Sequence, residues 1–85
     1  MIIEVDVPDY SRERGLRMKW EDGTRIEVKR GINSIIIRAN REGLLSLARL
    51  MLTLVAEEVP KGSHWHLDEL NSLEEGSQEL VVDKI

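Results

Sequence analysis

The stretch from Asn40 to Gly62 constrains this chain most, because it predicts one long helix and leaves the rest to strands and loops. Asn40 is a favoured N-cap residue, and Glu42 places a negative charge in the first turn. Apolar residues then recur at helical spacing over 44–55. Pro60 to Gly62 ends the pattern, since proline cannot continue a helix and glycine favours its end. We therefore predict a helix over about 41–59.

Outside this helix, apolar and polar residues alternate in short runs, which is typical of half-buried strands. The predicted strands are 2–7, 16–20, 25–29, 34–38, 63–68 and 79–83. Asp22-Gly23 is a strong turn signal and predicts a hairpin between the second and third of these strands. The β-branched run at 34–38 favours a central strand. Residues 1–85 are thus expected to form a single α+β domain, with the helix packed on one face of a mostly antiparallel sheet of about six strands.

The predicted helix has more apolar surface than one sheet needs. Its apolar arc spans roughly 220°, whereas a stripe of about 100° covers a sheet. The core stripe is expected to be Leu44, Leu47, Ala48, Met51, Leu54 and Val55, and the polar, solvent-facing strip Ser46, Arg49, Thr53 and Glu57. The surplus is Leu45, Leu52 and Leu50. We expect either a homodimer or contact with a partner protein through these leucines, or a loop around Tyr10 that covers them.

Composition excludes several classes of protein. There is no Cys, so neither a disulfide framework nor a thiolate metal site supports the fold. The first residues carry acids where a signal peptide needs bases and then an apolar run. The longest apolar-rich stretch, 44–55, is too short and too polar to cross a bilayer. We expect a cytoplasmic protein without membrane contact.

The charge distribution separates the two parts of the chain. The formal net charge is −4. Residues 57–85 contain eight acidic and two basic residues, a net of −6, whereas residues 1–56 carry +2. An acidic surface repels phosphate and attracts basic protein surfaces, so we expect no nucleic-acid binding. The alternative is an ordinary solvated acidic face.

The two histidines lie two residues apart in a predicted strand. His64, His66 and Asp68 would therefore share one face, with Trp65 on the other face and in the core. Two imidazoles and a carboxylate can bind zinc or another transition metal. The alternative is a pair of partly exposed imidazoles beside a carboxylate, and we expect no cofactor.

No pattern in the chain predicts catalysis. Ser63 lacks the surroundings of a nucleophile elbow, and no glycine-rich nucleotide-binding motif is present. Nothing in the sequence indicates that one member of the paired carboxylates at 57–58, 68–69 and 74–75 is desolvated, so they are interpreted as solvated charge. The sequence therefore predicts a protein that is not an enzyme.

Three segments resemble a known family. They are Asn40–Arg49 (NREGLLSLAR), Val59–Asp68 (VPKGSHWHLD) and Leu73–Leu80 (LEEGSQEL). Over about residues 33–84 the chain resembles the small immunity proteins of bacterial polymorphic toxin systems, specifically immunity family thirty-two. The family-like positions are His64, His66, Asp68, Gly76, Ser77 and Glu79. The resemblance implies a cytosolic antidote that binds and blocks a cognate toxin domain without chemistry of its own.

Charge and resemblance together predict a protein-binding surface. Its expected residues are Glu69, Glu74, Glu75, Asp68, His64 and His66. Their carboxylates would stand in for phosphates on the basic cleft of a nuclease-like toxin. Two alternatives remain open: a homodimeric structural or regulatory module without a toxin, and a small metal-binding protein that uses the His-x-His-x-Asp strand.

Overall fold

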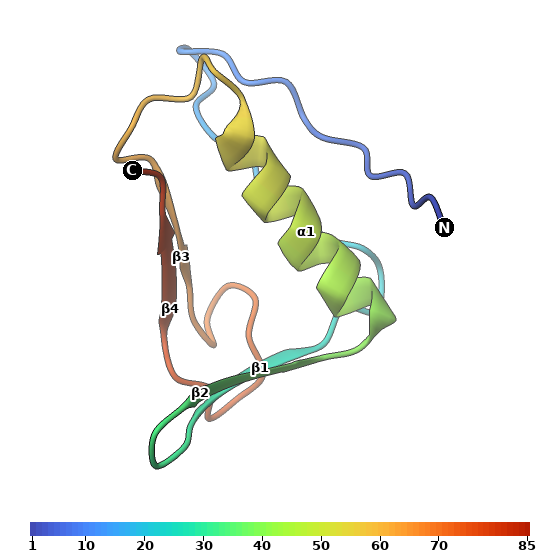
Figure 1. The fold of residues 1–85 in the computed structure, drawn as a ribbon, viewed down its shortest axis with the longest axis vertical. Helices are drawn as coiled ribbons and strands as arrows, with labels where there is room; N and C mark the ends of the chain where they lie inside the picture. The colour runs from blue at the N-terminus through green and yellow to red at the C-terminus, as the bar shows by residue number, and fades with distance from the viewer.

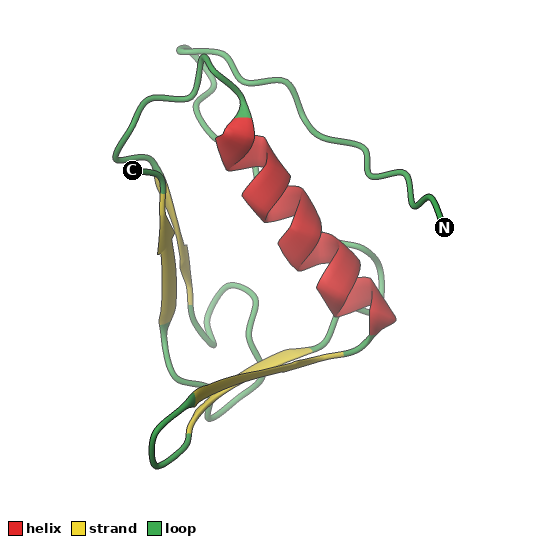
Figure 2. Ribbon diagram, in the orientation of Figure 1, coloured by secondary structure: helices red, strands yellow, loops and turns green.

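A computed structural model describes residues 1–85 and contains one helix and two short hairpins. The elements are β1 (Ile26–Arg30), β2 (Ile35–Ala39), α1 (Arg41–Val55), β3 (His64–Leu67) and β4 (Leu80–Asp83). β1 pairs only with β2, and β3 only with β4, both antiparallel. Figures 1 and 2 show the two hairpins and the helix along three sides of an open triangle. The α+β class is confirmed, but the single six-stranded sheet is wrong.

The predicted strands 2–7 and 16–20 do not form. The turn at Asp22-Gly23 is present, with the Thr24 N–H donating to Glu21 O at 3.2 Å and Gly23 at φ 81°, but no strand precedes it. The third strand instead pairs forward with β2, in the register Val28↔Ile37. The predicted central strand is therefore an edge strand.

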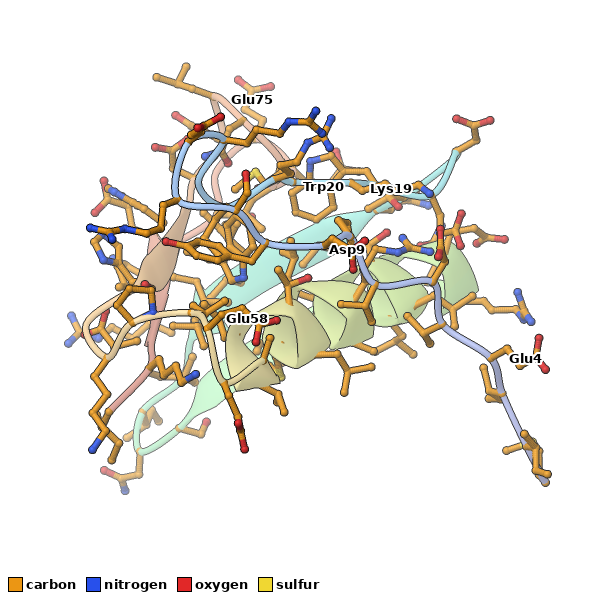
Figure 3. All side chains as sticks on the ribbon, turned by 90° about the horizontal axis from the view of Figure 1, so that it is seen from above. Glu4, Asp9, Lys19, Trp20, Glu58 and Glu75 are labelled. Carbon is orange, nitrogen blue, oxygen red and sulfur yellow. The ribbon has the colours of Figure 1, made fainter.

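The N-terminal segment is held by a buried arginine on the helix. Arg49 Nε donates to Asp6 O at 2.8 Å, Nη1 to Lys19 O at 3.4 Å and Nη2 to Glu21 Oε1 at 3.0 Å. Ser46 Oγ accepts the Glu21 N–H at 2.9 Å. Figure 3 shows this segment, with Lys19, passing beside the helix. Side chains of α1 thus satisfy backbone groups that a strand partner would otherwise satisfy.

These contacts overturn the predicted faces of the helix. The strip expected to face solvent is buried at Ser46, Arg49 and Thr53. The expected core positions Leu44, Met51 and Val55 are exposed instead. The face was misjudged because polar side chains can be buried wherever hydrogen-bond partners are available.

Both ends of α1 have identifiable caps. The Asn40 side chain accepts the Gly43 N–H at 2.8 Å, which confirms the predicted N-cap. The helix ends at Val55, so the predicted extension to 59 is wrong. Lys84 Nζ donates to the carbonyls of Ala56 and Val59 at 2.8 and 2.9 Å. These bonds satisfy carbonyls beyond the helix end, where Glu57 and Glu58 would oppose the helix dipole.

The core lies inside the triangle of elements. It is formed by Ile26, Val28, Leu47, Leu50, Leu54, Val59, Trp65, Leu67 and Leu73. The Trp65 indole N–H donates to Leu50 O at 2.7 Å, so the largest core side chain also has its polar atom satisfied. Trp65 is buried as the sequence predicts.

Candidate partner-binding surface

The β3–β4 hairpin carries both histidines on its outer face. Trp65 and Leu67 are buried while His64 and His66 are exposed, so β3 alternates as predicted. His66 Nε2 lies 3.6 Å from Glu79 Oε1 and 4.0 Å from Asp68 Oδ2. The two imidazoles do not share these partners, because His64 Nδ1 lies 3.8 Å from Asp83 Oδ1.

The turn after β3 is ordered by reciprocal hydrogen bonds between Asp68 and Asn71. Asp68 Oδ1 accepts the N–H groups of Leu70 and Asn71 at 2.9 and 3.2 Å. Asn71 Oδ1 accepts the Asp68 N–H at 3.0 Å, and Asn71 Nδ2 donates to His66 O at 2.8 Å. One oxygen of Asp68 is thereby tied to the turn, while Oδ2 remains directed toward His66.

The loop 74–78 is attached along the free side of β1. The N–H groups of Glu74 and Gln78 donate to the carbonyls of Ile26 and Val28, each at 2.8 Å. The Val28 N–H donates in turn to Ser77 Oγ at 3.2 Å. The loop therefore closes one edge of the β1–β2 hairpin without being a strand.

Gly76 and Ser77, two of the family-like positions, shape this loop. Gly76 has φ 84°, a conformation that other residues rarely adopt, and its N–H donates to Glu69 Oε2 at 2.8 Å. Ser77 makes the side-chain bond to β1 described above. Sequence reasoning left these roles open because no local pattern reveals which distant strand a loop contacts.

The three glutamates of the predicted surface differ in their partners. Glu69 bonds to the Gly76 backbone, and Glu74 Oε1 lies 3.4 Å from Arg25 Nε. Glu75 is exposed and forms no ion pair. Figure 3 shows Glu75 at the upper edge of the view and Glu4 at the lower right. We call the outward face of β3 and the loop 68–79 the acidic surface.

The acidic surface also contains a set of metal-ligating atom types. One ligand atom from each of His66, Asp68 and Glu79 lies within 4.8 Å of the others. Glu79, which was not among the predicted metal ligands, takes the place that the sequence suggested for His64. The side chains of His66 and Glu79 are at least half exposed.

The predicted dimer leucines lie in different environments. Leu50 is only 2% exposed and belongs to the core, so it cannot contribute to a surface. Leu45 is half-buried and lines an apolar groove with Ile3 and Val5 of the N-terminal segment. Leu52 is exposed.

The family comparison identifies the class of this protein. The chain matches the family described as Immunity protein 32 over residues 34–85, a range that includes β2, α1, β3 and β4. The chain therefore belongs to the Immunity protein 32 family, and the predicted resemblance is confirmed. Immunity proteins are non-catalytic inhibitors, so family membership also agrees with the expectation that the chain is not an enzyme. No curated protein and no solved structure matches the chain. Helix α1 lacks the length and apolar character that spanning a membrane requires.

Proposed function

We propose that the chain neutralises a cognate bacterial toxin domain in the cytoplasm by binding it with the acidic surface. The observation that carries this proposal is the match to Immunity protein 32, because it spans α1, β3, the loop 68–79 and β4. Binding alone, without turnover, would block the toxin.

The loop 68–79 is well ordered, which supports its use for recognition. Its backbone is attached to β1 at two points, and its Asp68–Asn71 turn is closed by side chains. A surface that is ordered before binding loses little conformational entropy when the complex forms. The charges on such a surface speed association with a basic partner and make it sensitive to salt.

A partner with a basic cleft, such as a nuclease-like toxin, fits this charge pattern. Glu75 is free to form an ion pair with a basic partner. Glu74 has one ion-pair partner, Arg25, whose side chain is exposed. His66 lies beside Asp68 and Glu79, and His64 lies beside Asp83. Both imidazoles add hydrogen-bonding groups to the surface. We assign contact with the toxin to Glu69, Glu74, Glu75, Asp68, His64 and His66.

Co-expression tests the proposal. The toxin-like product of the neighbouring gene is expressed in a susceptible bacterium with or without this chain, and growth is measured. We expect growth only when the chain is present and a stable complex of the two purified proteins. Growth arrest in the presence of the folded chain, together with no complex, would refute the proposal.

A further inference from the structure

Strand β2 has an edge on which no backbone group is paired. The Gly31 N–H donates to Ser34 O at 2.8 Å and the Asn40 N–H to Arg25 O at 3.1 Å. These bonds fix the antiparallel pattern, so Ile36 and Arg38 bond toward β1. The N–H and C=O groups of Ile35, Ile37 and Ala39 therefore point away from β1, and no loop or side chain bonds to them.

The same edge is apolar and lacks protection. Ile35 and Ile37 are 69% and 42% exposed. They lie on the same face of the hairpin as Val28, which is the partner of Ile37 and is fully buried. Proteins usually protect such edges with charged residues, proline or bulges. β2 has no proline and pairs with β1 without a bulge, and its only charge, Arg38, lies 3.5 Å from Glu27 of β1.

The total exposed surface is larger than expected for a chain of this size. A compact monomer of 9.8 kDa exposes about 5,200 Å², whereas this chain exposes 6481 Å². The excess of about 1,300 Å² is larger than the roughly 800 Å² that each partner buries in a standard interface. Part of it lies on the extended first residues, and part on the isoleucines of β2 and the exposed side of α1.

We propose that the chain forms a two-fold symmetric dimer in which β2 pairs antiparallel with β2 of a second copy, centred on Ile37. In this register Ile37 pairs with Ile37 of the second copy, and Ile35 pairs with Ala39 of the second copy. Every free backbone group of the edge therefore gains a partner. Arg38 then lies opposite Ile36, and no two like charges face each other directly. The sequence of β2 is therefore complementary to itself.

The other side of the hairpin explains why association stops at two copies. β1 is already covered by the loop 74–78 through its bonds to Ile26 and Val28. The joined sheet would have the order β1-β2-β2-β1, with both outer edges closed by loops. An interface that uses the same patch on both copies closes on itself and gives no fibre. This dimer also differs from one formed through the helix leucines, because it uses the backbone of β2.

Light scattering and amide hydrogen exchange test this dimer without the toxin. We expect the purified chain at high micromolar concentration to show twice the 9.8 kDa mass, and the amides of Ile35, Ile37 and Ala39 to be protected. Ile37→Pro should give a folded monomer, because the Ile37 N–H makes no bond within the chain. The control Ile32→Lys lies in the hairpin turn, is fully exposed and should stay dimeric.

Three results would overturn the inference. The first is a monomeric parent protein at the highest soluble concentration. The second is a dimer whose Ile35 and Ile37 amides exchange as fast as those of exposed loops. The third is a dimer that Leu52→Lys abolishes and a folded Ile37→Pro leaves intact, since it would place the interface on α1. If Ile37→Pro does not fold, the exchange of the Ile35 and Ile37 amides in the parent dimer decides between the two interfaces. Protected amides would support pairing through β2, and fast exchange would overturn it.

Discussion

Arg49 anchors the N-terminal segment to the helix, and replacing it by Met measures how much the fold depends on this anchor. Its side chain is 6% exposed and makes three hydrogen bonds to three residues of the segment. Bonds to charged groups contribute about 1.5–3 kcal/mol each when buried. Here the acceptors lie on exposed or half-buried residues, so water can bind them once the arginine is removed. We therefore take the contribution of each bond to the free energy of unfolding as about 1 kcal/mol.

We therefore expect Arg49→Met to lower the free energy of unfolding by about 3 kcal/mol, since Met preserves much of the apolar packing of the arginine stem. For a domain of this size the melting temperature should fall by about 12–24 °C. Urea unfolding followed by circular dichroism measures the first quantity. The matched control is Arg25→Met, whose side chain is 71% exposed and pairs with Glu74, and which should change stability by less than about 0.5 kcal/mol. Equal stability of the two variants would refute the anchoring role of Arg49.

Three further predictions concern the core, the helix packing and the histidine cluster. Trp65→Phe should lower the free energy of unfolding by about 1–3 kcal/mol, because it removes the buried indole N–H bond to Leu50 O and puts a smaller ring in the core. An unchanged midpoint in urea unfolding would contradict this. Gly43→Ala should lower the free energy of unfolding by at least about 1 kcal/mol, since the added Cβ would lie 2.5 Å from Arg25 O. This cost should exceed the gain from the better helix propensity of alanine. A stabilised variant in thermal melts would show that β1 and α1 can separate easily. Zinc at stoichiometric concentration should not raise the melting temperature, because the side chains of His66 and Glu79 are at least half exposed and Asp68 is tied to its turn through Oδ1. A clear rise that Glu79→Gln removes would instead establish a metal site.

Much of the fold follows from local patterns in the sequence. The N-cap at Asn40 and the alternation of β3 are set by neighbouring residues, and both were predicted correctly. Four of the predicted strands correspond to β1–β4 within a residue or two at each end. Such features depend on backbone capping and on side-chain alternation, which short stretches of sequence reveal directly.

The errors concern contacts between distant segments. Residues 16–20 alternate like a strand, but alternation does not specify a partner. Arg49 of α1 bonds to Lys19 O in this segment and to Glu21 just after it. The same bonds bury the strip of α1 that its polarity assigned to solvent. In the acidic surface, His66 pairs with Glu79 because β3 and β4 are neighbours, whereas sequence spacing suggested His64 and Asp68.

The association rate with the toxin is the most direct measure of whether the acidic surface makes the contact. The variant Glu69→Gln, Glu74→Gln and Glu75→Gln removes three charges from this surface, while the amides keep the hydrogen-bond acceptors. The control Glu4→Gln, Glu13→Gln and Glu58→Gln removes the same charge at exposed positions elsewhere. At low salt we expect association to slow by about tenfold or more for the first variant, with little change in dissociation and a much smaller effect in the control. Equal association rates for the parent and both variants would contradict binding through the acidic surface.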